Sequence, residues 1–81
     1  MQLLFFGKLA DRLGREILIS APPEGYSIAE LREIIAKEHP QAEADIRRSS
    51  VKACVGDAFV HDSFRVFEAD IVEFFPPVSG G

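Results

Sequence analysis

The stretch 27–40, SIAELREIIAKEHP, carries the strongest structural signal in the 81-residue chain. Ser27 and Glu30 have the spacing of a capping box, in which each side chain accepts a hydrogen bond from the backbone N–H of the other residue. His39 precedes Pro40 and ends the helix, because a residue before proline is disfavoured in the α region. Apolar side chains recur between these limits at helical spacing, at Ile28, Leu31, Ile34 and Ile35. The stretch therefore predicts one amphipathic helix with a single buried face.

Two strands are predicted before this helix. Residues 2–6 are aliphatic and aromatic, as in a mostly buried strand. Residues 16–20 alternate between polar and apolar side chains, and the segment 21–25, APPEG, ends the strand because proline lacks an N–H and glycine permits a turn. Between the strands, leucines four residues apart within 9–13, followed by Gly14, indicate a short helix with a glycine cap.

Three further strands are predicted after the helix. Residues 41–50 are mostly polar and are expected to form a loop with a short helical turn. Residues 51–55 alternate as a strand, and a turn at 56–57 leads into a very short paired strand at 58–60. Residues 70–75 form the last strand, which ends where two prolines follow it.

The order of these elements indicates an α+β fold. A chain of this length forms one domain, and a single helix can cover only one face of a sheet. The first two strands are joined by a tight connection and are therefore antiparallel, whereas the helix crossover allows later strands to run otherwise. We expect a mixed sheet of about five strands packed on one main helix.

Composition and charge exclude several classes of protein. With 47% hydrophobic and 27% charged residues, the body of the chain is expected to be folded. The net charge of −4 argues against nucleic-acid binding, which depends on neutralising phosphates with Lys and Arg, and predicts steering towards a partner with a basic face. The apolar stretch 3–6 is too short for a signal peptide or a membrane span. One cysteine, Cys54, cannot form an internal disulfide, so we expect a cytoplasmic protein.

Few side chains within the folded part point to chemistry. Cys54 is interpreted as a small buried residue, because no histidine lies close in sequence to activate it. His39 and His61 are interpreted as solvated, and Glu30 is accounted for by capping. The acidic residues of the connections are interpreted as solvated charges, at positions 43, 45, 57, 62, 68 and 70. The spacing of His and Cys favours no metal site.

The C-terminal residues 76–81, PPVSGG, have a different character. A frayed end is the default for terminal residues, but Pro76 and Pro77 favour polyproline II and hence a semi-rigid arm that projects from a domain formed by residues 1–75. Gly80 and Gly81 lack a Cβ and can thread a narrow channel. The α-carboxylate at Gly81 is therefore the candidate reactive group.

The terminal string 74–81, FFPPVSGG, carries a resemblance to a known family. A domain with this strand order that ends in Gly-Gly resembles the β-grasp family of ubiquitin and the sulfur-carrier proteins. The terminal string, together with 4–9, LFFGKL, and 12–14, RLG, is similar to the small subunits of molybdopterin synthase, so the match spans both ends of the chain.

The resemblance implies a function for the terminus. An ATP-dependent activating enzyme, similar to those of ubiquitin systems, would convert Gly81 to an acyl-adenylate, and sulfur transfer would give a thiocarboxylate. Inserted into the large synthase subunit of a heterotetramer, that group would donate sulfur to cyclic pyranopterin monophosphate in molybdenum-cofactor synthesis. The catalytic residues would lie on the large subunit, and this chain would itself bind no cofactor. The alternatives are a thiamine-pathway carrier, a carrier that modifies proteins, and a binding module whose tail only docks.

The strand alternation predicts an aromatic docking face. Phe6 and Phe75 fall on the side of the sheet opposite the helix, and in a β-grasp arrangement their strands are neighbours. Phe59 is a third candidate, the alternative being that its ring completes the core. Exposed aromatic clusters on small proteins often bind partners. The expected partner-binding residues are Phe6, Phe59, Phe75, Pro76, Pro77, Val78 and Ser79.

Overall fold

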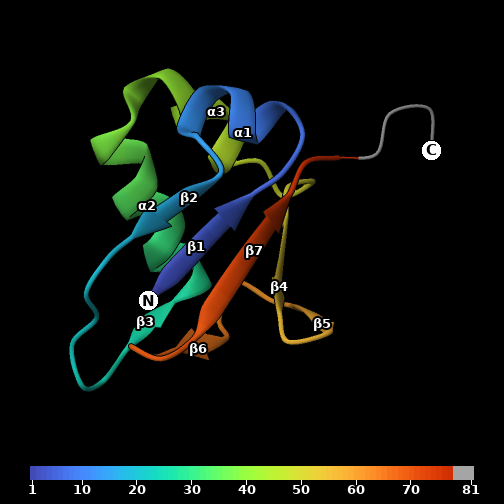
Figure 1. Ribbon diagram of the computed structural model, residues 1–81. Helices are drawn as coiled ribbons and strands as arrows, with labels where there is room; N and C mark the ends of the chain where they lie inside the picture. Colours follow the sequence, from blue (N-terminus) through green and yellow to red (C-terminus); the bar gives the residue numbers. More distant parts are fainter. Residues whose placement is uncertain (78–81) are drawn as a thin grey trace.

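The computed structural model describes residues 1–77, and Val78–Gly81 lie outside the described part. A five-stranded sheet packs on helix α2 (Figure 1). Its strands are β1 (Gln2–Phe5), β2 (Glu16–Leu18), β4 (Lys52–Val55), β5 (Ala58–Val60) and β7 (Ile71–Phe75). Their order is β2-β1-β7-β4-β5, with β1 and β7 parallel and the other neighbours antiparallel. The predicted mixed sheet on one main helix is confirmed.

Helix α2 (Ile28–Glu38) begins as its sequence predicts. The Glu30 N–H donates to the Ser27 hydroxyl at 3.1 Å, and the Ser27 N–H donates to the Glu30 carboxylate at 2.8 Å. These bonds hold the pKa of Glu30 below its usual value, chiefly through the backbone N–H of Ser27. His39 is the C-terminal cap, so the helix ends before Pro40. The capping box is confirmed at both hydrogen bonds.

The buried face of α2 differs from the prediction at two positions. Ile34 is only half-buried, whereas Arg32 is 6% exposed. Arg32 follows Ile28 by four residues and precedes Ile35 by three, so the helical period places it among the buried side chains. Apolar spacing alone did not reveal this position, because a charged residue is buried only when its hydrogen-bonding groups find partners.

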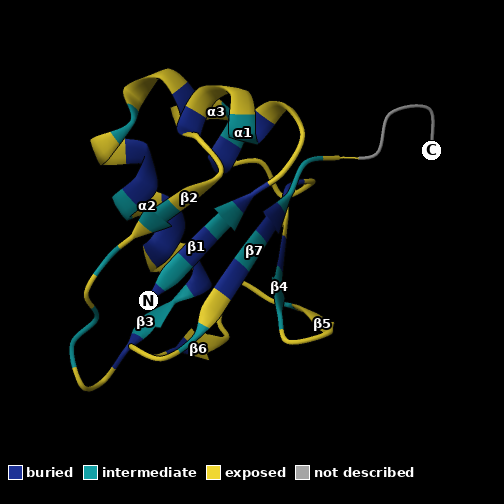
Figure 2. Ribbon diagram, in the orientation of Figure 1, coloured by how far each residue is buried: buried dark blue, intermediate teal, exposed yellow. Residues whose placement is uncertain are grey.

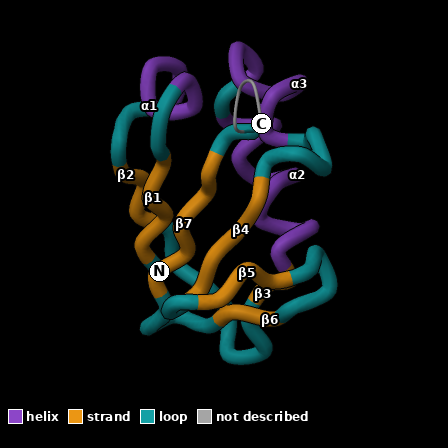
Figure 3. The backbone as a smooth tube through the Cα atoms, turned by 90° about the vertical axis from the view of Figure 1, so that its right-hand side faces the viewer, coloured by secondary structure: helices purple, strands orange, loops and turns teal. Residues whose placement is uncertain are grey.

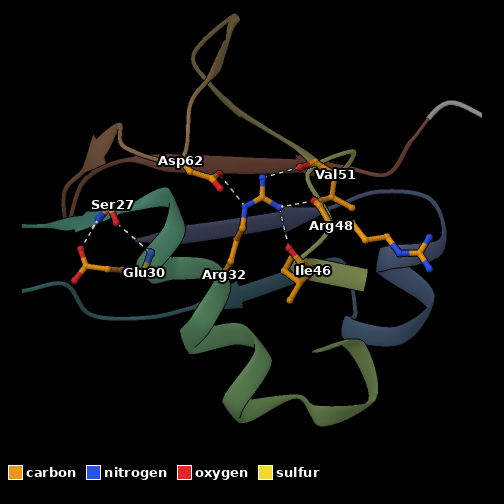
Figure 4. A network of polar contacts seen from close by, with 7 residues as sticks. All are labelled: Ser27, Glu30, Arg32, Ile46, Arg48, Val51 and Asp62. Atoms are coloured by element: carbon orange, nitrogen blue, oxygen red, sulfur yellow. Dashed lines mark hydrogen bonds and ion pairs between the residues drawn. The ribbon is translucent and has the colours of Figure 1, made fainter. Parts of the chain in front are cut away.

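Arg32 finds those partners in the chain between α2 and β4 (Figure 4). Its Nη1 donates to the carbonyl oxygens of Ile46 at 2.8 Å and Arg48 at 3.2 Å, and its Nη2 donates to that of Val51 at 2.6 Å. Its Nε forms a 3.0 Å ion pair with Asp62. The buried guanidinium thus ties the loop before β4 to the helix.

Short elements complete the fold. Helix α1 (Lys8–Leu13) and its Gly14 cap are confirmed, and α3 (Glu43–Ile46) is the helical turn expected after α2. A 3₁₀ turn (Pro40–Ala42) precedes α3. Strands β3 (Tyr26–Ser27) and β6 (Arg65–Val66) form a separate antiparallel pair that was not predicted. Two-residue strands are too short to show a period in the sequence.

The core lies between the sheet and α2 (Figure 2). Phe5 and Phe74 are neighbours in the β1–β7 register, and their buried rings stack with centroids 5.7 Å apart. The Arg32 guanidinium lies over the Phe74 ring at 5.7 Å from its centroid.

Within residues 1–77, no helix is both long and apolar enough to span a bilayer.

Some acidic residues of the connections are exposed, as expected, and also have specific partners. The Glu68 carboxylate accepts from the Ala21 N–H at 2.8 Å and from the Met1 amino group at 3.3 Å. These two donors, the Ala21 N–H first, lower the pKa of Glu68. Asp62 pairs with Arg32, as described above, and Asp70 accepts from the Phe67 N–H at 2.7 Å. The partners are distant in the sequence or in loops, where no pattern identifies them.

Candidate functional site: an aromatic patch beside the root of the tail

Phe6, Phe59 and Phe75 form a cluster on the open face of the sheet, which we call the aromatic patch. The rings of Phe6 and Phe75 stack with centroids 4.6 Å apart and an interplanar angle of 4°. Phe59 meets Phe75 edge-on, with centroids 6.3 Å apart. The juxtaposition expected from strand alternation is therefore confirmed for all three residues.

The register of the sheet builds this patch. Phe5 and Phe74 are paired in neighbouring strands and point into the core, so the next residues, Phe6 and Phe75, share the opposite face. Phe59 comes from β5, which lies on the far side of β4 from β7.

Exposure distinguishes the patch from the core. The exposed fractions of Phe6 and Phe59 are 37% and 70%, and Phe75 is half-buried between them. The alternative that Phe59 completes the core is therefore wrong, because its side chain is mostly in solvent. Exposed aromatic area of this kind is typical of a surface that is covered by a partner. Partner binding by the patch stays a prediction.

The tail leaves the domain directly beside the patch. Pro76 and Pro77 follow β7 without a break and form what we call the tail root. The tail root lies at the end of the molecule that carries α1 and α3, opposite β3 and β6 (Figure 3). Pro76 is half-buried and Pro77 is exposed. Val78, Ser79, Gly80 and Gly81, which the sequence analysis assigns to partner binding and chemistry, lie outside the described residues.

Gly7 sets how closely the tail root approaches the β1–α1 connection. Its φ is +58° and its ψ is −137°, a conformation that side chains with a Cβ rarely adopt. A Cβ at this position would lie only 2.8 Å from Cγ of Pro76. The absence of a Cβ at Gly7 therefore leaves room for the Pro76 ring of the tail root. The sequence around Gly7 did not reveal this contact.

Within residues 1–77, the other candidate side chains form no reactive group. Cys54 is half-buried on the open sheet face, not fully buried as expected, and its thiol lies 3.4 Å from the Gly56 carbonyl oxygen. His39 is half-buried and His61 is exposed. No three His, Cys, Asp or Glu side chains of this part of the chain come together as a metal site would require. These described side chains thus offer no candidate chemistry, and the chemistry predicted for the terminus falls on Gly80 and Gly81.

Three solved structures share the fold of this chain. Two crystal structures of small archaeal modifier protein 1 (SAMP1) from Haloferax volcanii are 20% and 17% identical to the chain, with TM-scores of 0.81 and 0.80. They cover 99% and 95% of this chain, and the match spans 97% and 95% of theirs. A protein from Pyrococcus furiosus, described as molybdopterin converting factor, subunit 1, is 24% identical with a TM-score of 0.74 and 95% coverage of both chains.

The comparison with protein families is more specific than the likeness in fold. No protein with a curated function matches the sequence significantly. The model of the ThiS family, in contrast, matches residues 3–81, which include the sheet, α2 and the terminal glycines. The chain therefore belongs to the ThiS family, and it is a sulfur carrier with the ubiquitin-like β-grasp fold.

Proposed function

We propose that this chain is the sulfur-carrier subunit of molybdopterin synthase. The observation that carries the proposal is the string 74–81, FFPPVSGG, in which Phe75 belongs to the aromatic patch and Pro76-Pro77 to the tail root. An exposed aromatic patch followed in the sequence by a Gly-Gly terminus suits a protein that presents its carboxylate to a partner's active site. The likeness to molybdopterin converting factor subunit 1 is consistent with the proposal.

The chemistry begins with activation of Gly81. A free α-carboxylate has a pKa near 3.3–3.7 and is ionised at neutral pH, so it is a poor electrophile. An adenylyltransferase of the ubiquitin-activating type uses ATP to form the acyl-adenylate of Gly81 and release pyrophosphate. A donor at the oxidation level of sulfide then forms the C–S bond at the acyl carbon and displaces AMP, so the terminus becomes a thiocarboxylate. In the cytoplasm, the large synthase subunit takes this terminus and passes its sulfur to cyclic pyranopterin monophosphate.

The geometry gives each part of the chain a separate task. Six residues from Pro76 onwards extend at most about 20 Å, which is enough to cross the rim of a cleft. The aromatic patch provides an anchor at the start of that length, and Gly80 keeps the last step free of a Cβ. The activating enzyme and the large subunit would use the same patch and therefore bind one at a time.

The test is sulfur loading of the terminus. The full chain is coexpressed with the adenylyltransferase of its own genome and analysed by intact mass spectrometry. The expected product has one oxygen replaced by sulfur, and the loaded carrier converts cyclic pyranopterin monophosphate to molybdopterin when the large subunit is added. A chain that gains no sulfur is a docking module, and one that gains sulfur but does not support this conversion serves another pathway.

A variant series locates the reaction at Gly81. One residue appended after Gly81, deletion of Gly81, and Gly80→Val should each abolish sulfur transfer and leave the melting temperature unchanged, because the folded domain is intact. An appended variant that mass spectrometry shows to be unprocessed, yet that still supports molybdopterin formation, would refute the mechanism.

Protein modification is a second candidate function. It is favoured by the TM-score of 0.81 to a structure whose name identifies a modifier protein, although at 20% identity this likeness establishes only the fold. Under this alternative, the activated terminus forms an amide with lysines of other proteins. Tagged carrier that appears in covalent conjugates, lost on deletion of Gly81, would support it.

A further inference from the structure

Two hollows flank the tail root, and both are lined by Pro76 and Pro77. The first, of about 530 Å³, lies towards α1 and α3 and includes Lys8, Arg12 and Arg48. The second, of about 480 Å³, lies towards the aromatic patch and includes Lys52. The side chains around the tail root are therefore rich in cations.

Three of these four cations have no ion-pair partner within the described part of the chain. The fourth, Arg12, forms a 3.0 Å ion pair with Asp45, which is the only acidic residue among the described residues that line the two hollows. Lys8, Arg48 and Lys52 are exposed, and none of them takes part in an ion pair among residues 1–77. We call these three residues the basic collar.

The collar reverses the charge of the chain locally. The whole chain has a net charge of −4, and because the collar carries +3, all other residues together carry −7. The expectation that an anionic chain is steered towards a basic face therefore does not describe the end from which the tail leaves.

The fold holds the collar in place. The Arg48 carbonyl accepts from the buried Arg32, while the Arg48 side chain points away from that network towards α1 (Figure 4). Lys52 is opposite Phe75 in the β4–β7 register, so it adjoins the aromatic patch. The collar and the patch thus form one continuous surface around the tail root.

We propose that the basic collar docks on a ring of Asp and Glu carboxylates at the mouth of the protein cleft that receives the tail. This inference rests on the proposed function. Gly81 is four residues beyond Pro77, so an extended tail places its carboxyl group up to about 14 Å from the tail root. When the tail is inserted at that full length, the terminus lies well beyond the roughly 4 Å of an ion pair, so phosphates of ATP bound there do not meet the collar. The groups that meet the collar belong to the mouth of the cleft.

Charges at the edge of an interface act mainly on association. They raise the rate of encounter and fix orientation, and their effect weakens with ionic strength. The collar therefore aligns the tail with the cleft before the aromatic patch is buried.

The test uses the full chain with each purified partner, the adenylyltransferase and the large synthase subunit, in stopped-flow association experiments. Lys8→Glu, Arg48→Glu and Lys52→Glu are combined in one variant and also made singly. Lys37→Glu is the matched control for each single variant, because Lys37 is exposed on α2, lines neither hollow and undergoes the same charge change.

At low ionic strength, the triple variant should associate at least about tenfold more slowly with each partner, with a smaller change in dissociation rate. The association rate of the unaltered chain should fall as the salt concentration rises, whereas that of the triple variant should not. Each single variant should be slower than Lys37→Glu. Melting curves confirm that all variants are folded.

The proposal is overturned if the single variants associate with both partners as fast as Lys37→Glu. It is also overturned if ATP, titrated into the isolated chain, causes saturable NMR shifts at the collar that are lost in the triple variant, because the collar would then be a phosphate site. If the unaltered chain is loaded with sulfur but the collar variants associate at the rate of the control, only the proposal about the collar is refuted. An unaltered chain that neither binds the partners nor gains sulfur refutes the proposed function and the collar with it.

Discussion

Replacing Arg32 with methionine, in comparison with Asp62→Asn, separates the carbonyl hydrogen bonds of this buried guanidinium from its ion pair. Arg32→Met retains an unbranched apolar side chain but removes every donor. The carbonyl oxygens of Ile46 and Val51, both in buried residues, then lose the hydrogen bonds of 2.8 and 2.6 Å that they accept. The ion pair with Asp62 is lost as well.

The loss in the free energy of unfolding depends on which buried groups are left without a hydrogen-bond partner. An unsatisfied buried acceptor costs about 1–3 kcal/mol, so two carbonyls cost about 4 kcal/mol. Removing a buried charge returns part of this, because the guanidinium no longer has to be desolvated. We expect a net loss of about 3 kcal/mol, a large share of the roughly 4–12 kcal/mol expected for a domain of this length.

Asp62→Asn is the matched control. The Asp62 side chain is 58% exposed, so solvent screens its charge, and the side-chain oxygen of Asn can still accept a hydrogen bond from Arg32 Nε. We therefore expect Asp62→Asn to cost only about 1 kcal/mol. Urea denaturation followed by circular dichroism gives the free energy of unfolding of both variants. If Arg32→Met costs under 1 kcal/mol, or if Asp62→Asn costs as much as Arg32→Met, the assignment of the stability to the carbonyl bonds is wrong.

Three other predictions concern the site and its support. Phe75→Ala should weaken binding to both partners by about 2 kcal/mol or more, as for an interface hot spot. Calorimetric titration measures this, and unchanged affinity together with a large drop in melting temperature would show that Phe75 acts in the core. Gly7→Ala combines strain at positive φ with a contact on Pro76, whereas Gly56→Ala has positive φ but no atom within 4 Å of the added Cβ. Both variants should therefore lose about 1–3 kcal/mol of stability, but only Gly7→Ala should slow sulfur transfer in assays at a temperature where both are folded. The pKa of Glu68 is lowered from 4.5, so its stabilising effect is present above pH 4.5 and is lost as the pH falls through the lowered value. The stability difference between the unaltered chain and Glu68→Gln should accordingly shrink from pH 7 to pH 3 in urea titrations, and a difference that grows would contradict this assignment.

Elements that depend on neighbouring residues could be predicted from the sequence. The Ser27–Glu30 capping box acts over one helical turn, and the limit at Pro40 arises from one steric contact, so α2 was predicted with both its ends. Strand alternation predicted that Phe6 and Phe75 share the open face, because side chains on a strand alternate strictly between its two sides. The Gly80–Gly81 terminus needs no fold to be recognised.

Other features depend on segments that are distant in the sequence. Arg32 is buried because carbonyls 14 to 19 residues away turn towards it, and no local pattern encodes that arrangement. The two-residue strands β3 and β6 are paired across more than 35 residues and exist only because the surrounding structure brings them together.

Spacing within a few residues is enough to predict the main helix and the open sheet face, and the order of the elements is enough to predict the α+β class. The reactivity of the Gly80–Gly81 terminus stays a prediction from the sequence. The charges that surround the tail root, in contrast, can be seen only in the tertiary structure. The basic collar comes from three separate segments, at Lys8, Arg48 and Lys52. These segments meet around Pro76 because β7 pairs with β1 on one side and β4 on the other. The physical reason is that hydrogen-bonding patterns and side-chain periods act locally, whereas an electrostatic surface is set by where the packed core leaves distant side chains in space.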